Sequence, residues 1–168
     1  MYAIGDLIYY GQLGVCRVGG IGVPAFLAND PGAPLYYTLE PIQKQGSVFV
    51  PVDGDAFIRP LMDRSEALAL IDRMPTISNS VRGGKNLQGI AQAYSEKMRS
   101  HNVDDLVSLI LAINEKKKQR AAVNRRIGNI DESYLKRAES LLFGELACAL
   151  GIEESAVPGF ITDRLTLH

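Results

Sequence analysis

The spacing of apolar residues along the chain changes near residue 60. Up to that point, short runs rich in β-branched and aromatic residues are separated by Gly, Asn, Asp and Pro, which predicts strands joined by turns. The expected strands are Leu7–Tyr10, Val15–Ile21, Leu35–Ile42, Val48–Val52 and Phe57–Ile58. The segment from Val23 to Pro34 is expected to form a long hairpin loop. Short strands at this density predict a small Tudor-like or SH3-like β-barrel.

After residue 60, apolar residues recur every three or four positions, which predicts amphipathic helices. Three of the expected helices start at capping residues: Asp63 (with Glu66), Asn102 and Asp131. Another is expected from the apolar stripe that runs from Leu87 to Met98. Pro75 ends the first helix, Gly151 ends the fourth, and the tail from Ser155 to His168 adds a short helix. The fold class is therefore α+β, with a β domain over residues 1–60 and a compact all-α domain over residues 61–168.

Composition and charge narrow the class of protein. The chain is 46% hydrophobic and 22% charged, as in a soluble globular protein. It shows no basic leader and no run of ~20 apolar residues, so we expect a cytoplasmic location and no membrane partner. Cys16 and Cys148 are far apart in apolar surroundings, which favours buried small hydrophobes over a disulfide or a metal site.

Catalytic patterns are scarce. His101 and His168 have no Cys, Asp or Glu at metal-ligand or triad spacing, and Asp104 with Asp105 suits a helix N-terminus better than acid–base chemistry. The segment Gly19 to Gly22 lacks both the dinucleotide fingerprint and the Gly-Lys-Ser/Thr of a P-loop. We therefore expect no enzyme, no cofactor, no metal and no small-molecule substrate, with a small hydrolase as the weakest alternative.

The expected strand at residues 47–52 favours partner binding. Its alternation places Val48, Val50 and Val52 on one face and Phe49 on the other, while Pro51 cannot donate a ladder hydrogen bond and indicates an edge or a bulge. An edge strand with an outward aromatic is suited to strand addition by a partner. The alternative is that Phe49 packs under a loop or against the helical domain.

A basic segment is the strongest charge feature. Residues 116–126 contain six cations and no acid: Lys116, Lys117, Lys118, Arg120, Arg125 and Arg126. The segment is either a solvated helix end, where cations suit the helix dipole, or a phosphate-binding surface.

Two separate groups of residues, in order, resemble the CarD/CdnL family of bacterial RNA-polymerase-binding regulators. The N-terminal group is Gly5 to Tyr9, Gly14, Val15, Tyr36, Tyr37, Leu39, Pro41, Val48, Val50 to Asp53, Ile58 and Arg59. The C-terminal group is Glu96 to Met98, Asn102, Leu106, Val107, Ile110 and the segment Asp131 to Leu146, which reads Asp-Glu-x-Tyr-Leu and then Ala-Glu-x-Leu-Leu. The resemblance covers about 85% of the chain.

The resemblance implies an N-terminal Tudor-like domain that docks on the β subunit of RNA polymerase through the exposed strand. Family positions that contact polymerase align near Pro24 and Phe49, so Val23, Pro24, Phe49 and Pro51 are the expected polymerase-binding residues. Some relatives carry basic residues at these positions, whereas this chain carries apolar ones.

The resemblance also implies a helical domain that touches promoter DNA beside the opening bubble, and with it a nucleoid-associated location. The family inserts a tryptophan into the minor groove, but this chain has no Trp, and Leu87 stands at or near the aligned position. Leu87 as the wedge, with Lys85 and the 116–126 cations on phosphates, is the expected DNA-binding set. Alternatively, Leu87 starts the core stripe that continues through Ile90, Ala91 and Tyr94.

These observations lead to two hypotheses of different class. The first is a CarD-like regulator that binds the polymerase β subunit and modulates open-complex formation at promoters. The second is a polymerase- or protein-binding adaptor whose helical domain no longer contacts DNA.

Overall fold

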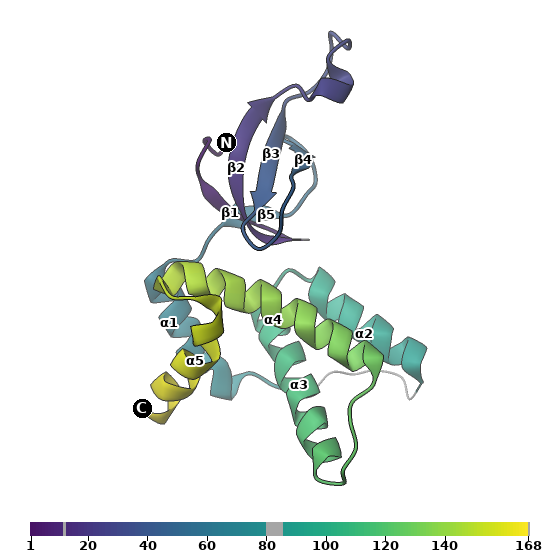
Figure 1. The fold of residues 1–168 in the computed structure, drawn as a ribbon, viewed down its shortest axis with the longest axis vertical. Coiled ribbons are helices and arrows are strands. Elements are labelled where there is room, and N and C mark those ends of the chain that lie inside the picture. The colour runs from purple at the N-terminus through teal and green to yellow at the C-terminus, as the bar shows by residue number, and fades with distance from the viewer. Residues whose placement is uncertain (12, 80–85, 168) are drawn as a thin grey trace. The chain divides into compact units, whose positions relative to one another are not determined.

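The computed structural model describes residues 1–11, 13–79 and 86–167 (Figure 1). The chain divides into two compact units, Met1–Met62 and Asp63–His168, which are described separately. The first is built on an antiparallel sheet and the second is helical, so the predicted α+β class is confirmed. No helix in the described ranges is long and apolar enough to cross a bilayer.

The N-terminal unit is a five-stranded antiparallel sheet with the order β4-β3-β2-β1-β5. The strands are β1 (Leu7–Tyr10), β2 (Gly14–Gly22), β3 (Tyr36–Pro41), β4 (Val48–Pro51) and β5 (Ile58–Pro60). A short 3-10 helix, Ala25–Leu27, lies in the connection from β2 to β3 that was expected to be irregular. The last strand was expected at Phe57–Ile58 but extends to Pro60, where Arg59 and Pro60 pair with Tyr9 and Ile8 of β1.

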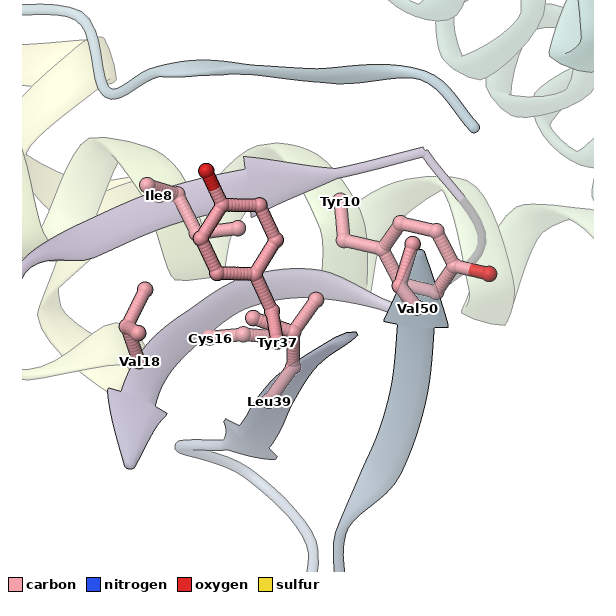
Figure 2. Close-up of a cluster of buried hydrophobic side chains, with 7 residues drawn as sticks. All are labelled: Ile8, Tyr10, Cys16, Val18, Tyr37, Leu39 and Val50. Carbon is pink, nitrogen blue, oxygen red and sulfur yellow. The ribbon is translucent and has the colours of Figure 1, made fainter. Parts of the chain in front are cut away.

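One face of the sheet forms the core of this unit. The buried cluster, drawn in Figure 2, contains Ile8, Tyr10, Cys16, Val18, Tyr37, Leu39 and Val50. The strands β1, β2 and β3 each contribute two alternate residues to it, as the period of two requires, and β4 contributes Val50. Cys16 is fully buried, and burial raises the pKa of its thiol to about 11, so it acts as a small hydrophobe.

The described part of the C-terminal unit contains five α-helices. They are α1 (Arg64–Arg73), α2 (Leu87–Arg99), α3 (Val103–Ala121), α4 (Asn129–Leu150) and α5 (Val157–Thr166). Short 3-10 turns, Met74–Thr76 and Glu154–Ala156, follow α1 and precede α5. The long helix α4 packs against each of the others and supplies much of the core through Ala138, Leu142 and Leu146.

Side-chain caps define where the helices begin. Asp63 accepts a hydrogen bond from the Glu66 amide (2.7 Å), and Asn102 accepts one from the Asp104 amide (2.9 Å). Both were expected as N-caps. The expectation for Asp131 was wrong, because α4 begins at Asn129 with Gly128 as its cap. Asp131 lies in the first turn of the helix.

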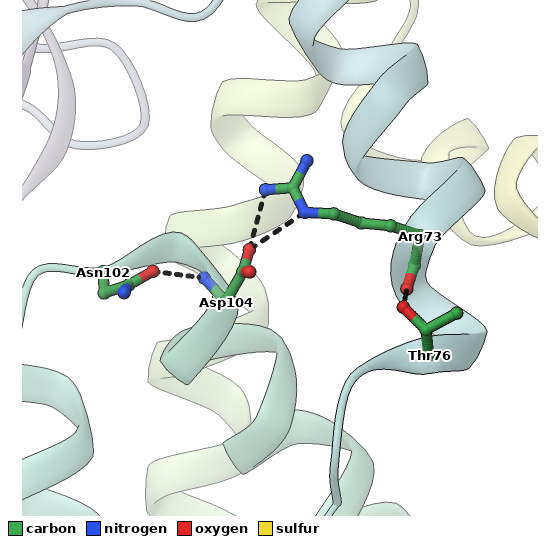
Figure 3. A network of polar contacts seen from close by, with 4 residues as sticks. All are labelled: Arg73, Thr76, Asn102 and Asp104. Carbon is green, nitrogen blue, oxygen red and sulfur yellow. Dashed lines mark hydrogen bonds and ion pairs between the residues drawn. The ribbon is translucent and has the colours of Figure 1, made fainter.

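An exposed ion pair joins the end of α1 to the start of α3. Arg73 donates from Nε and Nη2 to Oδ1 of Asp104, at 3.2 and 2.7 Å (Figure 3). Asp104 therefore does what its position predicts, placing negative charge at a helix N-terminus, and also links two helices. Both side chains are 43% exposed, so the pair contributes little to stability on its own.

Candidate functional site

Strand β4 lies at one edge of the sheet and pairs only with β3 among the described strands. The Val52 amide donates to the Leu35 carbonyl (3.0 Å), which extends the ladder beyond the strand. Since hydrogen-bonded pairs alternate along an antiparallel ladder, Val50 also directs its backbone groups toward β3. Phe49 and Pro51 therefore direct theirs outward, and Pro51 has no N–H to offer. The Pro51 carbonyl accepts the Gly54 amide (3.2 Å) in the turn that follows, so the outer edge presents the amide and carbonyl of Phe49.

The side chains of β4 divide between the two faces as predicted. Val50 is buried in the core, and Val48 and Val52 pack partly buried against it. Phe49 lies on the opposite face and is 46% exposed. The strand is therefore an edge strand with an outward aromatic.

Phe49 belongs to an exposed aromatic cluster, which consists of Phe26, Tyr36 and Phe49. The ring of Phe26 stands edge-on to Phe49 and Tyr36, with centroids 5.7 and 6.0 Å apart. Phe26 is 65% exposed at the 3-10 turn. The alternative that Phe49 packs under a loop is thus correct in part, but the packing leaves a large exposed aromatic surface beside the edge of β4.

Sequence reasoning missed Phe26 and Tyr36. Phe26 sits in a segment whose sequence predicts only a loop, and its contact with β4 spans more than twenty residues of chain. Among the residues that were predicted, Val23 is 47% exposed and Pro51 is partly buried. Pro24 is buried, and its carbonyl accepts the Leu27 amide (2.9 Å), so it shapes the turn instead of presenting a contact surface.

Leu87 is the first residue of α2 and is 67% exposed. The core stripe of α2 is carried by Tyr94, which is buried, with Ile90 and Ala91 partly buried. The alternative in which Leu87 begins this stripe is therefore wrong. Lys85, predicted beside it, lies outside the described residues.

Lys116 is turned toward the interior of the helical unit. Its Nζ lies 2.9 Å from Oδ2 of buried Asp131, and the Tyr94 hydroxyl donates to Oδ1 of the same carboxylate (2.6 Å). Burial would raise the pKa of Asp131, but the hydrogen bonds from Tyr94 and Lys116 hold it below its ordinary value. The charge of Lys116 is already compensated, which does not fit its predicted role on phosphate.

The other five predicted cations are exposed. Lys117, Lys118 and Arg120 lie on the last turns of α3, and Arg125 and Arg126 lie in the turn that follows. Burial raises the pKa of the Glu139 carboxyl, and the nearby charge of Lys117 offsets part of that rise. The structure thus gathers five cations at one end of α3, of which Lys117 is partly neutralised.

The described residues contain no group of three or more His, Cys, Asp or Glu side chains that could hold a metal ion. The candidate surfaces of the described residues are the β4 edge with its aromatic cluster, and the exposed ends of α2 and α3.

Comparison with known proteins identifies the family of the N-terminal unit. Residues 2–62 match the family model described as the CarD-like/TRCF RID domain. The match covers the whole N-terminal sheet and bears out the resemblance of the first sixty residues. No curated protein matches the chain.

Proposed function

From the premise that the N-terminal unit is a CarD-like/TRCF RID domain, we propose a regulator that docks on the polymerase β subunit and modulates open-complex formation. The domain family is a non-enzymatic protein-interaction module that binds RNA polymerase, so the chain has a transcription-related function. The β subunit, promoter DNA and the nucleoid-associated location belong to the proposal.

The observation that carries the proposal is the outer edge of β4. A partner strand can pair with the amide and carbonyl of Phe49, as in recognition by strand addition. The missing N–H at Pro51 keeps this pairing short. The aromatic cluster beside it supplies the apolar contact area that interface anchors require.

The promoter half of the proposal rests on Leu87. A large apolar side chain left 67% exposed at the tip of a helix can insert at a base step, as other apolar wedges do. The exposed cations on the last turns of α3 provide the phosphate contacts in this proposal.

The adaptor hypothesis is favoured by two other observations. Lys116 is paired with Asp131, and the chain contains no Trp. In that case the β4 edge still binds polymerase while the helical unit makes no contact with promoter DNA.

Leu87→Ala separates the two hypotheses. Because Leu87 is exposed, we predict a change in the free energy of unfolding within about 0.5 kcal/mol. The regulator hypothesis predicts that the variant loses the effect of the wild-type chain on open-complex lifetime, measured with polymerase on a promoter carrying a fluorescent base in the bubble.

The matched control is Leu167→Ala, which removes another exposed leucine from the helical unit. It should keep the wild-type effect. If the wild-type chain binds polymerase but leaves the open-complex lifetime unchanged, the adaptor hypothesis replaces the regulator hypothesis.

A further inference from the structure

The turn between α3 and α4 carries an exposed apolar residue among cations. Val123 is 65% exposed, and Arg120, Arg125 and Arg126 surround it in sequence. Within the helical unit, this turn lies at the end of α3 that projects away from α1 and α5 (Figure 1). A single exposed valine is ordinary, so the inference depends on how the turn is built and on its charge.

Backbone hydrogen bonds fix the shape of the turn. The Arg125 amide donates to the Arg120 carbonyl (2.8 Å), the Asn124 amide donates to the Ala121 carbonyl (3.1 Å), and Asn124 is left-handed with φ +57°. This is the pattern of a Schellman helix end. Such an end usually places apolar side chains at the positions that Arg120 and Arg125 occupy here. Val123 is therefore held at a defined apex, and the usual apolar contact is replaced by two guanidinium groups.

The base of the turn is anchored as well. Asp131 binds Lys116 one turn before the cationic end of α3, and Tyr94 ties the same carboxylate to α2. Arg120 also donates from Nη1 to the Arg126 carbonyl (3.4 Å). A preformed apex loses little conformational entropy when it binds a ligand.

The charge of the turn selects its partner. No acidic residue occurs from 116 to 126, and arginine guanidinium groups match phosphate oxygens in pairs. DNA grooves are flanked by phosphates on both sides and admit a narrow apolar tip at base steps. We propose that the α3–α4 turn enters a groove of duplex DNA, with Val123 inserted at a base step and Arg125 and Arg126 on the flanking phosphates. The inference extends the proposed promoter contact to a second apolar tip, distinct from Leu87.

The test measures binding of the full chain to a fluorescently labelled 30-base-pair duplex over a range of salt concentrations. Arg125→Gln combined with Arg126→Gln should weaken binding and reduce the slope of log affinity against log salt by about 2, roughly one for each phosphate that is no longer neutralised. The matched control is Arg17→Gln combined with Lys44→Gln, which removes the same charge from the exposed surface of the N-terminal unit. The control should keep the wild-type slope.

Val123→Ser tests the apolar tip. It should lower affinity severalfold with an unchanged slope, and it should abolish the signal of a fluorescent base analogue that reports unstacking in the duplex. Val123→Leu should retain both. If Val123→Ser matches the wild type in affinity and in base-analogue signal, the tip does not touch the bases and the inference is wrong.

The remaining outcomes separate this inference from the proposed function. If the arginine double variant and the wild type have equal salt slopes, the groove contact is overturned. This holds even if Leu87→Ala still changes the open-complex lifetime, which tests the proposed function. A second result is that the arginine double variant weakens binding to polymerase and leaves binding to the free duplex unchanged. That result assigns the turn to an acidic protein surface and also overturns the groove contact. Polymerase binding by the same preparations reports on β4 docking independently.

Discussion

At the scale of single residues, Asp131 shows how a polar side chain organises the helical unit. It is 4% exposed and accepts hydrogen bonds from Tyr94 and Lys116, which come from α2 and α3. A buried carboxylate is stable only when its charge is compensated in this way. Asp131 therefore links α4 to α2 and α3.

The stability supplied by Asp131 should depend on pH. The folded-state pKa lies below the ordinary value of 3.8, so its contribution is fully present above that value and is lost as the pH falls through the folded-state pKa. We predict that Asp131→Asn lowers the free energy of unfolding by about 2 kcal/mol at pH 7. The difference from the wild type should shrink as the pH is lowered from 5 to 2, as measured by chemical denaturation.

Tyr94→Phe serves as the companion variant, since it removes one hydrogen bond and leaves the ion pair with Lys116. A difference between Asp131→Asn and the wild type that stays constant from pH 7 to pH 2 would contradict this account of the carboxylate.

At the scale of elements, the ends of helices are set by a few residues. The helix α4 stops at Gly151, which is left-handed with φ +68°, and the Ile152 amide returns to the Ala147 carbonyl (3.1 Å). Glycine adopts this conformation without the cost that a Cβ imposes. The sequence identified this stop because Gly follows directly on the apolar stripe.

Gly151→Ala should therefore destabilise the chain by about 1 kcal/mol, measured by thermal or denaturant unfolding. Gly159 offers a control of opposite sign, because it lies inside α5 with open space around its missing Cβ. Gly159→Ala should stabilise by about 0.5–1 kcal/mol. Equal effects of the two substitutions would show that backbone conformation does not govern the end of α4.

The same elements show how far sequence reasoning reaches. Local signals predicted the strands to within a few residues, the caps at Asp63 and Asn102, and the edge character that Pro51 gives to β4. Contacts between distant segments were not accessible. Phe26 reaches Phe49 through tertiary packing, and Lys116 is neutralised by an aspartate fifteen residues away that local signals predicted as a helix cap.

At the scale of the whole molecule, the two units have different kinds of exposed surface. The N-terminal unit presents a sheet edge with aromatic side chains and belongs to a polymerase-interacting domain family. The C-terminal unit presents apolar tips at Leu87 and Val123 with cations beside the second. In the proposed function, the N-terminal unit binds polymerase and the C-terminal unit acts at the promoter, so the proposed promoter contact depends on polymerase docking.

The most direct test of the central claim is the affinity of Phe49→Ala for RNA polymerase and for its isolated β-subunit lobe. Removing an aromatic interface anchor should weaken both interactions by ~1–3 kcal/mol, about 5- to 150-fold, while the fold stays intact because Phe49 is half exposed. Ile4→Ala, at an exposed apolar residue outside β4, should bind like the wild type. Wild-type affinity of a folded Phe49→Ala variant for both partners would contradict docking through β4.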